Sequence, residues 1–158
     1  MVSFMADGVC ASIFPARALS APPPTGLFLS WNHARVDVMT VPCCMIVEDQ
    51  AVIGMSLEAY LEDAGFTVAG PFPSCADVLP WLERNTPQVA VLDVSLRDGT
   101  ALPVAHELKE RNTPFAIYTG LPFTASLPQE LKDVPWLEKP APREELTQVI
   151  AHLGHRAS

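Results

Sequence analysis

The chain has 158 residues, of which 18 are acidic and 10 basic, and its formal net charge of −8 argues against intrinsic binding to the phosphates of nucleic acids. Hydrophobic residues make up 49% of the sequence and charged residues 18%, so a folded core is expected and disorder throughout the chain is excluded. No apolar stretch approaches the roughly 18 residues that a membrane-spanning helix needs, so no membrane partner is expected.

The cysteines favour a reduced, cytoplasmic protein. The sequence contains 4 cysteines, and none of them shows the C-x2-C spacing of a zinc site. Cys43 and Cys44 open an apolar run, where cysteine behaves as a small hydrophobic residue. A secreted scaffold held by disulfides is therefore disfavoured.

Residues 1–42 differ in pattern from the rest of the chain. They include Pro22-Pro23-Pro24 and sustain neither the period of a strand nor that of a helix. A signal peptide fits poorly, because no basic region precedes the apolar residues 9–14. We expect residues 1–42 to be a poorly ordered N-terminal extension, or to lie upstream of a true start near Met39.

Residues 43–154 alternate short apolar runs with helical patterns and are expected to form one domain, followed by a tail over 155–158. The expected strands cover residues 43–47, 66–69, 89–92, 115–118 and 136–138, and the expected helices cover 50–64, 75–85 and 101–111, with a last helix from about residue 143. Ser74 and Thr100 are expected to cap the second and third helices. Two prolines make residues 121–134 weakly helical at best. The alternation predicts an α/β fold with a doubly wound, five-stranded parallel sheet.

Polar side chains stand where four of these strands end. Glu48 and Asp49 follow the first strand, and Asp93 follows the third. Thr119 and Lys139 follow the fourth and the fifth. Because ligands bind at the carboxyl ends of the strands in open α/β sheets, these five side chains are expected to meet.

The expected cluster suits phosphoryl transfer. Two adjacent acids that repel each other are relieved by Mg²⁺, which prefers carboxylate oxygens. Asp93 can act as a nucleophile toward a phosphoryl group, Lys139 can supply positive charge and Thr119 a hydroxyl donor. Each residue alone also has an ordinary explanation, such as a helix cap or a surface lysine. Their joint order along the chain favours the site.

The sequence resembles the receiver domains of two-component response regulators of the chemotaxis-regulator type. The resemblance covers about residues 43–154 and is carried by Met45-Ile46-Val47-Glu48-Asp49-Gln50, Val91-Leu92-Asp93-Val94-Ser95, Asp98-Gly99, Tyr118-Thr119-Gly120 and Leu137-Glu138-Lys139-Pro140. It implies the flavodoxin-like receiver fold with strand order 2-1-3-4-5. It also implies that Asp93 is the phosphoacceptor and that Mg²⁺ is the cofactor, with these ligands: Glu48, Asp49, Asp93 and the backbone carbonyl of Ser95.

The resemblance assigns further roles at the ends of the last two strands. Thr119 and Lys139 would bind the phosphoryl group, and Trp136 would be the switch aromatic that couples to Thr119. The Lys139-Pro140 bond would be cis. The chain departs from the family at Arg97, where a proline is usual, and at Trp136, where tyrosine or phenylalanine is usual.

The expected function is that of a single-domain response regulator rather than an enzyme, with only Mg²⁺-dependent self-phosphorylation and self-dephosphorylation. A sensor histidine kinase or phosphotransfer protein would phosphorylate Asp93, and the chain would then signal through an unknown protein or act as a phosphate sink or relay. The open alternative is a receiver-like interaction module that works without phosphorylation. A dehalogenase-type phosphatase is disfavoured by Ser95, which stands where its general acid belongs, and a flavodoxin-like cofactor binder by the charge of Glu48-Asp49.

Overall fold

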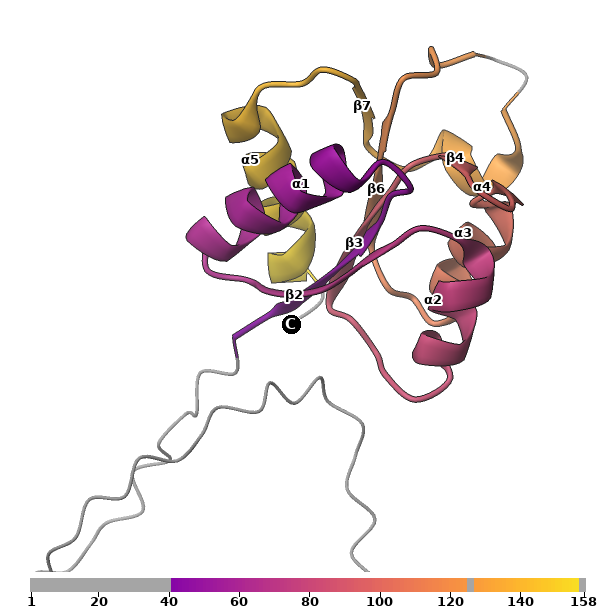
Figure 1. The fold of residues 1–158 in the computed structure, drawn as a ribbon, viewed down its shortest axis with the longest axis horizontal. Helices are drawn as coiled ribbons and strands as arrows, with labels where there is room; N and C mark the ends of the chain where they lie inside the picture. Colours follow the sequence, from indigo (N-terminus) through magenta and orange to yellow (C-terminus); the bar gives the residue numbers. More distant parts are fainter. Residues whose placement is uncertain (1–40, 125–126, 157–158) are drawn as a thin grey trace, which may run out of the picture.

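The computed structural model describes residues 41–124 and 127–156. The expected extension over residues 1–42 therefore lies almost entirely outside the described residues. Within the described ranges, five parallel strands form one sheet with helices on both faces, which confirms the expected α/β fold (Figure 1). None of the helices in these ranges is long and apolar enough to cross a bilayer.

The sheet has the expected strand order. Its strands are β1 (Cys43–Val47), β2 (Thr67–Phe72), β3 (Val89–Leu92), β6 (Phe115–Thr119) and β7 (Trp136–Glu138), in the order β2-β1-β3-β6-β7. Every residue of β1 and β3 is buried, as expected of parallel strands that are covered on both faces. β2 is longer than the sequence indicates, because Val47 still pairs with Phe72 beyond an irregularity in the register.

Two helical layers cover the sheet, as Figure 1 shows with α1 and α5 on the left and α2, α3 and α4 on the right. The helices are α1 (Ala51–Asp63), α2 (Cys75–Leu82), α3 (Leu102–Glu110), α4 (Gln129–Lys132) and α5 (Arg143–Arg156). Successive side chains of a strand face opposite layers, so Met45 joins the core under α2 and α3 while Ile46 joins the core under α1 and α5.

The helix caps agree with the sequence at one site and differ at the other. The Ser74 hydroxyl accepts a hydrogen bond from the Asp77 N–H at 3.2 Å, which confirms the expected cap of α2. The expected cap at Thr100 is wrong, because Ala101 holds the N-cap position of α3 and makes no side-chain cap. Thr100 instead belongs to a small antiparallel hairpin, β4 (Ser95–Leu96) and β5 (Gly99–Thr100), where it pairs with Ser95.

The register of the sheet brings the strand ends to one edge. Val47 lies beside Leu92 and Thr119 beside Glu138, so the residues that follow β1, β3 and β7 leave the sheet close to the end of β6. Among the described residues between β6 and β7, the helical structure is limited to the four-residue α4, in line with the weak helical signal there.

Candidate functional site

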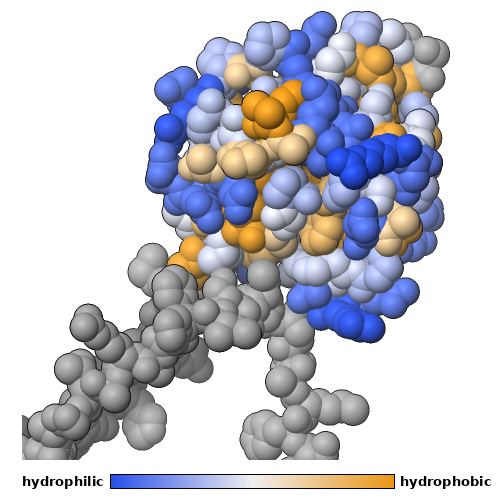
Figure 2. Space-filling view, in the orientation of Figure 1, coloured by the Kyte–Doolittle hydropathy of each residue, from blue (hydrophilic) through white to orange (hydrophobic). Residues whose placement is uncertain are grey.

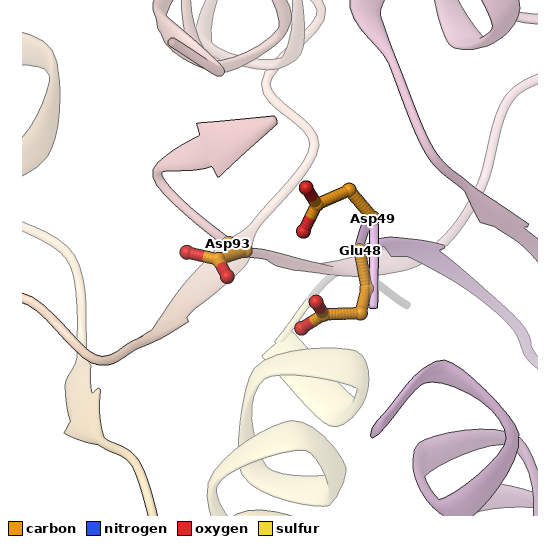
Figure 3. A group of neighbouring side chains, drawn as sticks. All are labelled: Glu48, Asp49 and Asp93. Atoms are coloured by element: carbon orange, nitrogen blue, oxygen red, sulfur yellow. The ribbon is translucent and has the colours of Figure 1, made fainter. Parts of the chain in front are cut away.

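Three carboxylates meet at the carboxyl edge of the sheet. Glu48 and Asp49 follow the end of β1 and Asp93 follows the end of β3, and Figure 3 shows the three side chains near one another at these strand ends. One oxygen from each carboxylate lies within 4.8 Å of the others. Glu48 and Asp93 are buried, with 2% and 5% of their surface exposed, whereas Asp49 is half-buried. The structure thus brings together the acids that the sequence singled out.

Asp93 is held by Thr119 and Lys139, which the sequence singled out as its partners, and by the backbone N–H of Ser95, which the sequence did not indicate. Its Oδ1 accepts a hydrogen bond from the Thr119 hydroxyl at 2.7 Å and one from the Ser95 N–H at 3.2 Å. Its Oδ2 pairs with the Lys139 ammonium at 2.6 Å. Thr119 is buried at the end of β6, so its hydroxyl has a fixed position. Both oxygens of the Asp93 carboxylate therefore have partners, which fix the orientation of the group.

Lys139 bridges two of the acids. Its Nζ lies 2.5 Å from Glu48 Oε2 as well as 2.6 Å from Asp93 Oδ2, and only 11% of its side chain is exposed. Its backbone N–H donates to the carbonyl of Thr119 at 2.9 Å, which continues the pairing of β6 with β7. The Lys139-Pro140 bond is cis, as expected. The pairing of β6 with β7 thus places the Lys139 ammonium beside the carboxylates of Glu48 and Asp93.

Burial and charge act in opposite directions at this cluster. Burial raises the pKa of Glu48 above its ordinary value, although the hydrogen bond from Lys139 opposes the change. Burial alone would lower the pKa of Lys139, but its hydrogen bonds and charge interactions with Asp93 and Glu48 outweigh burial and raise it. With all groups ionised, three carboxylates against one ammonium leave two negative charges. This donor set fits a divalent cation such as Mg²⁺ in both charge and ligand type.

A hydrogen-bonded path runs from Asp93 to Trp136. The Thr119 hydroxyl, which donates to Asp93, also accepts from the Leu121 N–H at 3.4 Å. The carbonyl of Leu121 in turn accepts from the indole N–H of Trp136 at 3.2 Å. Trp136 packs edge-on against Phe123, with ring centroids 5.5 Å apart. The expected coupling partner of Thr119 is therefore connected to it through one backbone unit.

The hairpin that follows Asp93 is tied to α2. Both oxygens of Asp98 accept backbone N–H bonds, from Cys75 and Ala76, each at 3.0 Å. These bonds hold the pKa of Asp98 below its usual range. The N–H of Arg97 donates to the carbonyl of Pro73 at 3.3 Å, a bond that a proline at position 97 could not make. Arg97, where a proline is usual in the family, thus adds a backbone hydrogen bond between the hairpin and the segment before α2.

Sequence reasoning missed three contacts around the site. These are the carboxylate of Asp98 at the start of α2, the ring of Phe123 on Trp136, and the ring of Tyr118, whose centroid lies 5.4 Å from the Lys139 ammonium. For Tyr118 the sequence indicates only the face of the sheet, since this residue precedes Thr119 in a strand and points to the opposite side, and the contact with Lys139 does not follow from that.

Comparison with known proteins gives a family and several similar structures. The family model of the response regulator receiver domain matches residues 44–151. Comparison with curated proteins finds no match. Among solved structures, SdrG from Sphingomonas melonis Fr1 is 33% identical with a TM-score of 0.60, and the alignment covers 72% of this chain and 96% of that one.

Two other receiver structures share the fold at lower identity. The CheY-like receiver domain from Methanospirillum hungatei JF-1 is 20% identical with a TM-score of 0.65, covering 75% of this chain and 97% of that one. The one from Methylobacillus flagellatus is 22% identical with a TM-score of 0.61, covering 72% and 99%. Together with the family match over residues 44–151, the fold and the clustered acids lead to one conclusion: the chain belongs to the response regulator receiver domain family of two-component signalling, a family of signalling modules rather than classical enzymes.

Proposed function

We propose that the chain is a response regulator receiver that accepts a phosphoryl group on Asp93 from a sensor histidine kinase or a phosphotransfer protein. The phosphorylated form then signals through a protein partner or serves as a phosphate sink or relay. One observation carries the proposal: the Thr119 hydroxyl and the Lys139 ammonium contact opposite oxygens of the Asp93 carboxylate, at 2.7 and 2.6 Å.

In the proposed transfer, a carboxylate oxygen of Asp93 attacks the phosphorus of a phosphohistidine. The new O–P bond forms as the N–P bond breaks, and the donor imidazole keeps the electron pair of that bond. Lys139 and Thr119 turn from the carboxylate toward the phosphoryl oxygens, where an ammonium and a hydroxyl stabilise the developing charge. Attack by water on the phosphorus later breaks the O–P bond, releases inorganic phosphate and restores the free carboxylate.

The proposed Mg²⁺ ligands are Glu48, Asp49, Asp93 and the backbone carbonyl of Ser95. When bound, Mg²⁺ supplies positive charge that neutralises the phosphoryl oxygens and the attacking carboxylate. The contribution of the chain is to hold its acids close together, with ligand oxygens of Glu48, Asp49 and Asp93 within 4.8 Å of one another, and to keep Lys139 beside them.

Phosphorylation replaces the single negative charge of the Asp93 carboxylate with an acyl phosphate that carries about −1.5 to −2 charges on three outer oxygens, which changes what Thr119 binds. When the Thr119 hydroxyl turns to the phosphoryl group, its hydrogen bond from the Leu121 N–H is lost or shifted. The carbonyl of Leu121 accepts a hydrogen bond from the indole N–H of Trp136. Trp136 is therefore the side chain that we propose responds to phosphorylation.

The phosphodonor protein is proposed to dock on α1. This helix begins two residues after Asp49, and it leaves Val52 and Met55 exposed, at 79% and 66%. Figure 2, in the orientation of Figure 1, shows an orange apolar patch in the region of α1 within a largely polar surface. An apolar patch beside the acids suits a protein that must bring its phosphohistidine to Asp93.

Phosphotransfer from purified, phosphorylated histidine kinases of the host tests this proposal. We expect at least one kinase to lose its label rapidly to the wild-type chain and not to Asp93→Asn. Val52→Asp should slow that transfer without slowing phosphorylation by a small acyl phosphate. Binding to kinases without any transfer would contradict the proposal and favour the interaction module that works without phosphorylation.

A further inference from the structure

We propose that Tyr118 is a positioning residue for Lys139: its ring holds the ammonium between Glu48 and Asp93 and so sets the rate at which Asp93 accepts a phosphoryl group. This inference rests on the proposed function and extends it to a residue that makes no contact with Asp93 in the hydrogen bonds and ion pairs described above.

The surroundings of the Lys139 ammonium carry the inference. Its Nζ lies 2.5 Å from Glu48, 2.6 Å from Asp93 and 5.4 Å from the centroid of the Tyr118 ring. An ammonium has three N–H donors, and the two carboxylates use two of them. The electron-rich face of the ring provides a third attractive partner, at a distance within the roughly 6 Å range of cation–π contacts.

Burial strengthens the contact between the Tyr118 ring and the Lys139 ammonium. Only 11% of the Lys139 side chain is exposed, so little water competes with the ring for the ammonium. Cation–π attraction is stronger at such desolvated positions than at open surfaces. Lysine has a flexible four-carbon stem, whereas the ring turns about only two side-chain bonds, so the ring restricts the lysine rather than the reverse.

The sheet fixes the ring in place. Tyr118 pairs with Leu137 and Thr119 with Glu138, which locks the end of β6 against β7. Because neighbouring side chains of a strand face opposite sides, Thr119 reaches Asp93 while Tyr118 packs against the core under α1 and α5. The last two residues of β6 thus supply both a hydroxyl for the phosphoryl group and a platform for the lysine.

Removing the ring should release the ammonium without removing its charge. In Tyr118→Leu the lysine keeps its carboxylate partners but spends less time in one place, so we expect phosphorylation of Asp93 to slow about three- to tenfold. Tyr118→Phe is the matched control, because it keeps the ring face and removes only the hydroxyl. Its rate should stay near that of the wild type.

The test combines a rate with a spectroscopic signature. Rates of Mg²⁺-dependent phosphorylation by a small acyl phosphate are measured for wild type, Tyr118→Phe, Tyr118→Leu and a second ring-free variant, Tyr118→Val. In the same proteins without phosphodonor, NMR follows the Lys139 ε-methylene protons, which a nearby ring face shifts upfield. We expect the shift and the rate to persist with phenylalanine, and both to fall in each folded ring-free variant.

The inference, but not the proposed function, would be overturned by a wild-type rate in the ring-free variants or by a Lys139 proton shift that does not change when the ring is removed. A phenylalanine variant as slow as the leucine variant would overturn it too, because the hydroxyl would then be the active group. Absence of phosphorylation in the wild type would instead overturn the proposed function and, with it, the effect on rate, even if the NMR shift still confirmed the contact.

Discussion

Three carboxylates meet at the carboxyl edge of the sheet and two of them share the Lys139 ammonium, so at the residue scale these acids carry more negative charge than Lys139 neutralises. Glu48 is 2% exposed, and burial raises its pKa above the ordinary value. The proposed cation would relieve this charge, and the stability of the protein should therefore depend on both protons and Mg²⁺.

The pH dependence follows from the direction of the Glu48 shift. A carboxyl group whose folded pKa lies above its ordinary value of 4.5 binds protons more tightly in the folded protein than in the unfolded chain. Without Mg²⁺, the stability of wild type relative to Glu48→Gln should therefore fall as pH rises from 4.5 through the folded pKa. Denaturant unfolding of both proteins across this range measures the difference, and a relative stability that rises with pH would contradict the assignment.

Mg²⁺ should stabilise the folded protein through the same acids. A ligand that binds only the folded state at about 100 times its Kd adds about 2.7 kcal/mol to the free energy of unfolding. We expect thermal unfolding to shift upward with Mg²⁺ in the wild type, to shift much less in Asp49→Asn, and to return when a chelator is added. An equal Mg²⁺ response in Asp49→Asn would mean that Asp49 is not a ligand.

At the scale of elements, α2 depends on two caps from different parts of the chain. The N–H groups of its first turn all have acceptors: Asp98 for Cys75 and Ala76, and Ser74 for Asp77 and Val78. Such bonds satisfy donors that have no partner within the helix. The helix is thereby joined both to the end of β2 and to the hairpin that follows Asp93.

Ser74→Ala should lower the free energy of unfolding by about 0.5–2 kcal/mol, because the alanine cannot accept from the Asp77 N–H. Ser74→Thr keeps the acceptor and serves as the control. Denaturant unfolding of the three proteins measures the loss. An alanine variant as stable as the wild type would show that Asp98 alone is enough to start α2.

The sequence predicts most elements because four of the five strands of the sheet are short apolar runs with a polar residue at or just after their end. The run Val89–Leu92 before Asp93 shows this, since all four of its residues are buried in β3. The prediction of a helix cap at Thr100 was wrong because Thr100 pairs with Ser95 in the hairpin, a contact that the local sequence does not reveal. The partners of Asp98 lie 22 and 23 residues away, so no local pattern could show them.

The functional site, like the fold, could be predicted in part from the sequence. The meeting of Glu48, Asp93 and Lys139 follows from strand ends that share one edge of a parallel sheet. The ring of Tyr118 under Lys139 does not follow, because the direction that a lysine takes depends on packing in three dimensions.

At the scale of the whole molecule, we propose that residues 43–154 form the receiver unit and that residues 1–42 are an extension. The family match over residues 44–151 supports this division. A chain without residues 1–40 should keep the thermal unfolding transition and the Mg²⁺ response of the full chain. Calorimetry of both chains tests this, and a lower transition in the shortened chain would show that the extension contributes to the folded unit.

The central claim is that Asp93 accepts one phosphoryl group in a site completed by Mg²⁺. The most direct measurement is intact-mass spectrometry of wild type and Asp93→Asn after incubation with Mg²⁺ and a small acyl phosphate, with a chelator as the metal control. The wild type should gain the mass of one phosphoryl group only when Mg²⁺ is present, and Asp93→Asn should gain none. Equal labelling of the two proteins, or an unlabelled wild type, would contradict the claim.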